Sequence, residues 1–235
     1  DASVSLRPSI ESTFQAALDH AVVAQTHSVA TLVPAISPEG RIAAQEKLAG
    51  LPFVIVPYAK PGLPLTQEIL ARVTPSTRIV ILQNHGLICC GASVEEVADH
   101  LAEVERRLSM GARHVSDHAP SAPPAAGFDW ANETWLANDT RASTLAISGS
   151  YYPDHVVFLG PALPKADHIG TPPAILCSGE GVLLRSQATS SQKAMLKCLS
   201  DVLSRLPEEW SAEAIGDAAE AELLNWDAEK YRQAL

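Results

Sequence analysis

The sequence predicts a mixed α/β protein, with an α/β first half and an α+β second half. In the first half, helical and strand-like patterns alternate over residues 9–113. In the second half, short strand-like runs are separated by Gly, Pro and Asp, and long helical patterns follow them. A segment rich in Pro and Ala, without periodicity, lies between the two halves.

Hydrophobic periodicity places the first elements of the first half. Pro38 and Gly50 are typical of the start of a helix and of the position just beyond its end. The clearest strand pattern is RIVILQ, residues 78–83. The expected elements, in order, are a helix over 9–19, a strand over 21–26, a helix over 38–49, a strand over 53–56, a helix over 65–73 and a strand over 78–83.

A long helix is expected from Ser93 to about residue 113. Ser93 and Glu96 have the S-x-x-E spacing of a capping box, which satisfies free backbone N–H groups at a helix start. The apolar residues that follow recur at helical spacing, so one face of this helix is buried.

The second half gives weaker signals. We expect strands near 143–149, 155–159, 174–177 and 182–185, and helices over 188–206 and 211–234. These patterns divide the chain into a core over 1–115, a linker or mobile loop over 116–128, and an α+β region over 129–235.

Composition limits the classes of partner. The chain has 235 residues, a formal net charge of -10, 46% hydrophobic and 19% charged residues, which is ordinary for a globular protein. An acidic protein repels phosphate backbones, so no nucleic-acid partner is expected. No apolar run reaches the roughly 18 residues of a membrane span. Because no basic-then-apolar leader pattern is present either, we expect a cytoplasmic protein.

The four cysteines are interpreted as buried free thiols in a reducing compartment. No pair has the C-x-x-C spacing of a zinc knuckle. Cys89 and Cys90 are adjacent, so they would point to opposite faces of a sheet if they lie on a strand.

Polar side chains that could carry chemistry gather near the ends of two expected strands. Gln25 and His27 are two positions apart, so on a strand they point to the same face and could hold one ion. His85 follows the clearest strand and precedes a glycine. Glu11 lies on the first helix, between Ser9 and Ser12. A structural histidine and a carboxylate that favours a helix N-terminus are the alternative interpretations.

The amino-acid sequence around these residues resembles that of the class II aldolase/adducin family. The stretch PSIESTFQAALDHAVVAQTHSVATLVPAIS, residues 8–37, carries the likeness, together with the Gln-Asn-His-Gly turn at 83–86. VPYAKPG at 56–62 and SVEEV at 93–97 are also similar to the family. In the second half, YYPDHVVFLG and ELLNWDAEKYRQAL resemble its longer, rhamnulose-phosphate-aldolase-like branch, which is related to fuculose-phosphate aldolases.

The resemblance implies a three-layer α/β/α core with a C-terminal α+β extension. It also implies a Zn2+ site, or a site for another divalent ion, with His27 and His85 as ligands and Glu11 as the catalytic acid/base. The implied reaction is aldol cleavage of a small phosphorylated ketose through a metal-stabilised enediolate. Family members commonly form homo-oligomers with the active site near subunit boundaries, which we expect here as well.

Two positions depart from the family pattern. Gln25 stands where the family has the first histidine of a His-x-His pair. Gln25 could bind a harder ion through its carbonyl oxygen, His155 could replace it, or the site could hold no metal. The family's phosphate-binding loop lies well upstream of the glutamate, so we expect either that this N-terminal part of the domain is missing from the sequence or that the protein does not bind phosphate in the usual way.

Further candidates are expected to contact substrate: Asn84, Tyr58, Asp154 and His155. A capped turn is the alternative interpretation of Asp154 and His155. Other activities of the same scaffold, namely epimerase, dehydratase or decarboxylase, remain open. So does a non-catalytic, adducin-like interaction module with a degenerate metal site.

Overall fold

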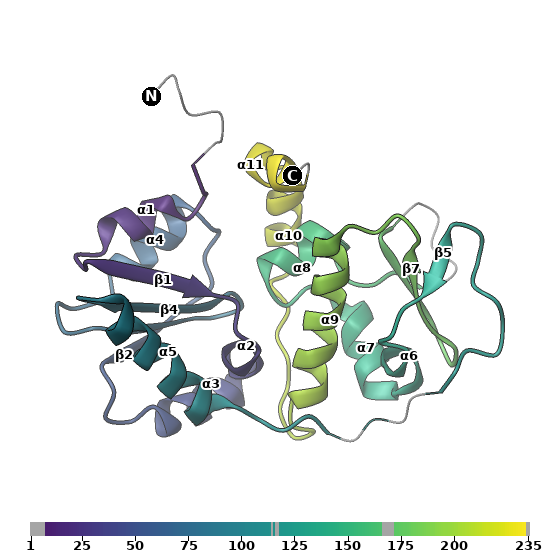
Figure 1. The fold of residues 1–235 in the computed structure, drawn as a ribbon, viewed down its shortest axis with the longest axis horizontal. Helices are drawn as coiled ribbons and strands as arrows, with labels where there is room; N and C mark the ends of the chain where they lie inside the picture. The colour runs from purple at the N-terminus through teal and green to yellow at the C-terminus, as the bar shows by residue number, and fades with distance from the viewer. Residues whose placement is uncertain (1–7, 114, 116–117, 166–171, 234–235) are drawn as a thin grey trace.

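Two α/β units lie side by side in the computed structural model, which describes residues 8–113, 115, 118–165 and 172–233 (Figure 1). A four-stranded sheet organises the first half and a three-stranded sheet the second. Among the described residues, no helix is long and apolar enough to cross a membrane.

The first half follows the predicted alternation of helices and strands. Its sheet has the order β1-β4-β3-β2, with β2 and β3 parallel and the other pairs antiparallel. The elements are α1 (Ser12–Ala17), β1 (Val22–Thr26), α2 (Val29–Ala35), α3 (Pro38–Lys47), β2 (Phe53–Val56), α4 (Leu63–Leu70), β3 (Ile79–Leu82), β4 (Gly86–Gly91) and α5 (Val94–Leu108).

This half has the three-layer α/β/α architecture that was predicted. The alternation of side chains along β3 sends Ile79 and Ile81 to one face of the sheet and Val80 and Leu82 to the other. Helices α2, α3 and α5 cover the first face, and α1 and α4 cover the second. The sheet is therefore buried on both sides, which explains why its central strands are uniformly apolar.

Strand β4, GLICCG, was not predicted because all of its residues are buried and its sequence does not alternate. The expectation for its cysteines is confirmed. Cys89 packs with α2 and α5, and Cys90 packs with α1 and α4 on the opposite face. Both thiols are free and buried.

The predicted cap of α5 is confirmed at Ser93, whose hydroxyl accepts a hydrogen bond from the Glu96 N–H. The Glu96 carboxylate accepts from the Ala92 N–H, one residue before the expected partner. The helix ends at Leu108 rather than near residue 113. Beyond it, the Arg113 N–H donates to the Ser204 carbonyl of the second half. This N–H group therefore does not take part in a helical hydrogen bond.

Helix α2 was also not predicted, and all of its residues except Val29 are buried. Ser28 caps its start by accepting from the Thr31 N–H. Ala30 and Ala35 face the four-stranded sheet, whereas Leu32 and Val33 pack into the hydrophobic core of the second half. A helix that is apolar all round lacks the periodic polar face by which helices are recognised in sequence.

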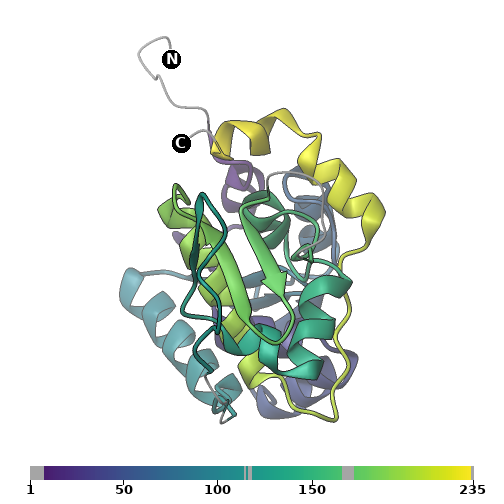
Figure 2. The ribbon, with the colours of Figure 1, turned by 90° about the vertical axis from the view of Figure 1, so that its right-hand side faces the viewer.

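The second half places its antiparallel sheet, of order β5-β7-β6, on the outer side of the long helix α9. Figure 2 shows its strands (green) facing the viewer. The elements are β5 (Phe128–Trp130), α6 (Trp135–Asn138), α7 (Thr140–Ser148), α8 (Pro153–Leu159), β6 (Ala174–Cys177), β7 (Gly181–Arg185), α9 (Ser190–Arg205), α10 (Asp217–Leu224) and α11 (Asp227–Gln233).

Two predicted strands of the second half are wrong. The segments 143–149 and 155–159 belong to helices α7 and α8. Asp139 caps α7 by accepting from the Ala142 N–H, and Pro153 occupies the first turn of α8, where proline is favoured. Local β-branched residues suggested strands, but burial against neighbouring helices overrides that weak preference.

Two predicted helices have different bounds. The first helix, expected over 9–19, begins only at Ser12, which leaves Glu11 at its N-cap position. The helix expected over 211–234 is replaced by α10 and α11. Residues before α10 are extended because their N–H groups bond elsewhere: Glu213 donates to Ile36 O and Ile215 to Ser150 O.

Candidate metal centre

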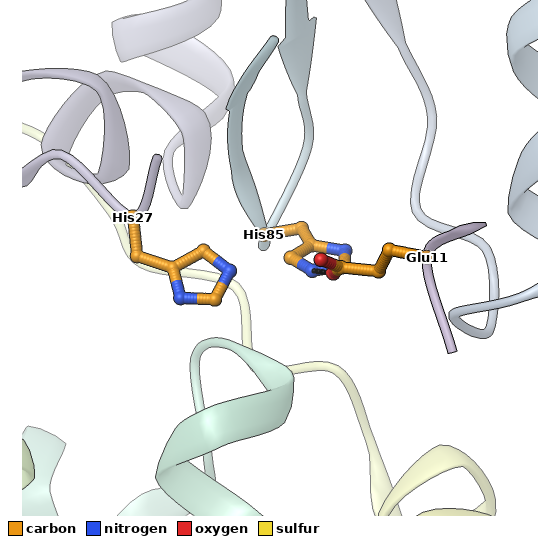
Figure 3. A group of neighbouring side chains, drawn as sticks. All are labelled: Glu11, His27 and His85. Carbon is orange, nitrogen blue, oxygen red and sulfur yellow. Dashed lines mark hydrogen bonds and ion pairs between the residues drawn. The ribbon is translucent and has the colours of Figure 1, made fainter. Parts of the chain in front are cut away.

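Three side chains capable of binding a metal converge where the two halves meet (Figure 3). They are Glu11, His27 and His85, and their ligand atoms all lie within 4.8 Å of one another. Glu11 is at the start of α1, His27 directly follows β1, and His85 lies in the turn between β3 and β4. The structure therefore brings together three residues that the sequence places far apart.

Strand pairing accounts for the meeting of the two histidines. Thr26 at the end of β1 pairs with Leu87 at the start of β4, so His27 and His85 extend from adjacent strand ends. Gly86 allows this approach, because a Cβ atom there would lie 2.5 Å from the Thr26 carbonyl oxygen and 3.1 Å from the His27 ring. The ring centroids of the two histidines are 5.3 Å apart.

Asn84 secures the turn that carries His85. Its backbone has a φ of 53°, a conformation that asparagine tolerates better than most residues. Its buried side-chain amide donates to the carbonyl oxygens of Tyr151, at 3.0 Å, and Glu213, at 2.7 Å. Both donors are thus used to attach the turn to the second half. Its predicted contact with substrate remains a prediction.

Glu11, Gln25 and His85 are in mutual contact. The Gln25 amide nitrogen lies 2.9 Å from Glu11 Oε1 and 3.2 Å from His85 Nε2, and His85 Nε2 lies 3.1 Å from Glu11 Oε1. Burial raises the pKa of the Glu11 carboxyl, but hydrogen bonds from His85 and Gln25, with the charges of His85 and His27, bring it below its ordinary value. Glu11 is therefore held as a carboxylate.

His27 has a partner from the second half of the chain. Its Nδ1 atom lies 3.0 Å from Oδ2 of Asp154, in the first turn of α8. A carboxylate accepts, so Nδ1 carries the proton and Nε2 presents its lone pair to the ligand group. The structure places Asp154 against the distal side of a ligand candidate, and its predicted contact with substrate remains a prediction.

The other predicted site residues lie outside this contact network. His155 is fully buried beside the Tyr151 and Tyr152 rings, its Nδ1 accepts from the Tyr151 N–H, and burial lowers its pKa to about 3. The Tyr58 hydroxyl is buried without a hydrogen-bond partner among the described residues. Burial, followed by Glu222 and Glu220, raises the pKa of Tyr58 to about 12. Substrate contacts for His155 and Tyr58 remain predictions.

The donor set fits a divalent ion. Two imidazole nitrogens and a carboxylate oxygen are common ligands of transition metals. A carboxylate on the second nitrogen of a ligating histidine, as Asp154 is on His27, is a recurrent feature of such sites because it fixes the tautomer and orientation of the ring. Sequence reasoning did not find this role of Asp154, since no local pattern links the two residues.

Known proteins resemble part of the chain. A family model described as the class II aldolase and adducin N-terminal domain matches residues 3–111. The uncharacterized oxidoreductase YuxG of Bacillus subtilis is 34% identical over 91 residues, which make up 38% of this chain and 13% of that protein. The 3-oxo-tetronate 4-phosphate decarboxylase of Escherichia coli is 32% identical over 56 residues, 24% of this chain and 26% of that enzyme.

Among solved structures, the N-terminal class II aldolase domain of a conserved protein from Thermoplasma acidophilum aligns with 43% of this chain and 46% of its own, at 25% identity and a TM-score of 0.40. The matched stretches thus span well under two thirds of each of these relatives.

Proposed function

The chain belongs to the class II aldolase and adducin family through residues 3–111, and from this we propose that it is a metal-dependent lyase that breaks a carbon–carbon bond beside a carbonyl group. The observation that carries the proposal is the convergence of Glu11, His27 and His85 within 4.8 Å. The buried Asp154 carboxylate behind His27 supports it, because a decayed site would have no use for this support.

Each side chain then has a separate task. His27, His85 and Glu11 would hold a divalent ion, which supplies Lewis acidity toward a substrate carbonyl when bound. Asp154 keeps the proton of His27 on Nδ1 and so leaves Nε2 free. When the carbon–carbon bond breaks, its electron pair moves toward the carbonyl, and one carbon later takes up a proton. Glu11, a carboxylate in contact with His85, is the group that we assign to that proton transfer.

We propose a small phosphorylated ketose as the substrate and retro-aldol cleavage as the reaction. In that reaction a hydroxyl next to the breaking bond loses its proton and becomes an aldehyde, while the other fragment keeps the electron pair. The family membership of residues 3–111 supports this reaction type.

Decarboxylation of a phosphorylated 3-oxo acid is a second candidate, favoured by the similarity of 56 residues to a 3-oxo-tetronate 4-phosphate decarboxylase. Both reactions leave an electron pair on the carbon beside a carbonyl, so the same residues would serve both. They differ in the fragment that leaves, an aldehyde in one case and carbon dioxide in the other.

The test is to load the purified protein with Mn2+ or Zn2+ and supply ketose 1-phosphates and phosphorylated 3-oxo acids in parallel. Aldehyde would be measured by a coupled dehydrogenase and carbon dioxide by its release. We expect one product with one substrate class, and its loss in Glu11→Gln. A protein that binds metal but cleaves nothing would instead support the non-catalytic, adducin-like interaction module.

A further inference from the structure

Gln25 lies inside the ligand group rather than beside it. Its terminal amide nitrogen is 2.9 Å from Glu11 Oε1, 3.2 Å from His85 Nε2 and 3.4 Å from His27 Nε2. One end of a single side chain therefore contacts the ligand atom of all three metal-binding candidates.

Two of these separations, 3.2 and 3.4 Å, are those of neighbouring ligands around one ion, and the third, 2.9 Å, is that of a hydrogen bond to the Glu11 carboxylate. With metal–ligand bonds of about 2.0–2.2 Å, the ligand atoms of a tetrahedral shell lie about 3.2–3.6 Å apart. The end of Gln25 thus occupies a fourth ligand position. Its place on β1 explains this, because Gln25 and His27 are two residues apart and point to the same side.

The amide has two ends of nearly equal shape. Its nitrogen donates, which suits the carboxylate of Glu11 and the lone pair of His27 Nε2 when no ion is bound. A half-turn about the last side-chain bond replaces that nitrogen with the carbonyl oxygen, which is a ligand for cations. The same residue can therefore satisfy the ligand atoms without an ion and coordinate the ion when it arrives.

We propose that Gln25 is a metal ligand through its side-chain oxygen, and that this oxygen makes the site less selective for Zn2+ over an oxygen-preferring ion such as Mn2+. The proposal rests on the metal-dependent function proposed above. Two imidazoles, a carboxylate and an amide oxygen form a set with equal numbers of nitrogen and oxygen donors. Imidazole favours zinc, whereas carboxylate, carbonyl and water suit manganese.

The experiment measures metal affinity rather than activity. Dissociation constants for Mn2+ and Zn2+, added as simple salts, would be obtained by calorimetry and chelator competition for the wild-type protein, Gln25→His and Gln25→Met. Methionine keeps the length of the side chain but removes its oxygen. Gln45→His, at an exposed position on α3, controls for an added histidine. Circular dichroism would verify that each variant is folded.

We expect Gln25→His to raise the Zn2+ affinity at least about tenfold relative to its effect on Mn2+, because imidazole replaces an amide oxygen. Gln25→Met should lower the Mn2+ affinity, and Gln45→His should change neither. Unchanged Mn2+ affinity in Gln25→Met would overturn the assignment of Gln25 and leave the metal-dependent function standing. A wild-type protein that binds neither ion, while Gln25→His binds zinc, would overturn both.

Discussion

The two halves of the molecule contribute to the candidate metal centre in different ways. The first half supplies every ligand candidate, from a helix start, a strand end and a tight turn. The second half supplies groups that hold those ligands: the carboxylate of Asp154 behind His27 and the carbonyl oxygens that accept from Asn84. The first half therefore carries the ligand side chains, and the second half helps to fix their positions.

The two histidines differ in how the protein holds them in position. His27 is half-exposed, and Asp154 fixes its tautomer from across the boundary between the halves. His85 is almost fully buried, and its Nδ1 atom has no hydrogen-bond partner among the described residues. Burial positions His85, whereas the contact with Asp154 orients His27. Substitutions that remove a ligand should thus be distinguishable from substitutions that remove a support.

The largest effect is expected from removal of a ligand. His27→Ala and His85→Ala should each weaken divalent-ion binding by more than the roughly 10–100-fold that supporting residues contribute. Isothermal titration with Mn2+ and Zn2+ would measure this loss. His100→Ala, on α5 beside Glu96, is the matched control and should bind as the wild type does. Retention of wild-type affinity in both ligand variants would show that the ion binds elsewhere.

Removal of the support from the second half should have a smaller effect. Asp154→Asn keeps the size of the side chain but removes the charge that holds the proton on His27 Nδ1. We expect a loss of metal affinity of about 10–100-fold. The same titration would measure it, with Asp129→Asn on the exposed edge of β5 as the control. An unchanged affinity would mean that the first half alone determines the geometry of the site.

Acid should destabilise the second half through His155. Burial lowers its pKa to about 3, from an ordinary value of about 6.5. The unfolded chain takes up a proton below about pH 6.5 and the folded chain does not, so stability present above that pH is lost as pH falls. At roughly 1.4 kcal/mol per pH unit, the loss at pH 5 is about 2 kcal/mol.

Urea unfolding of the wild-type protein and of His155→Gln at pH 7 and pH 5 would measure this contribution. The variant should lose less stability than the wild type between the two pH values. Equal losses would indicate that His155 is protonated in the folded protein.

The smallest effect on stability is expected at Tyr58, in the first half. Because its buried hydroxyl has no hydrogen-bond partner among the described residues, Tyr58→Phe should change the free energy of unfolding by less than about 0.5 kcal/mol. Cleavage assays on the same preparation would test the predicted substrate contact. If Tyr58 contacts substrate, the activity of Tyr58→Phe should fall although its free energy of unfolding is unchanged. A loss above about 1 kcal/mol would reveal a partner for the hydroxyl.

The sequence predicts best where the signal is local. The apolar run of β3 and the Ser93 cap of α5 lie within a few residues of the structure that they specify. Helix α2 and strand β4 were missed because uniform burial removes their periodicity. Val156 and Val157 suggested a strand, but burial of their faces against other helices stabilises α8.

The site residues also differ in whether the sequence alone could identify them. Glu11, His27 and His85 were identified from the resemblance of their surroundings to a known family, and the structure brings them together. The pairing of Asp154 with His27, and the contact of Gln25 with all three, depend on how distant segments pack. Tertiary contacts of this kind leave no mark in the spacing of residues along one chain.

Helix α2 has a consequence for the order in which the protein becomes active. It begins two residues after His27, and its Leu32 and Val33 pack against residues of the second half. While the chain emerges from the ribosome, that apolar surface has no cover until α9 has been synthesised. The stretch that the family model matches, residues 3–111, thus leaves part of its apolar surface to be covered by residues outside it. A nascent chain can hold its ligand residues in place only after the residues of the second half that pack on α2 and contact His27 have been synthesised.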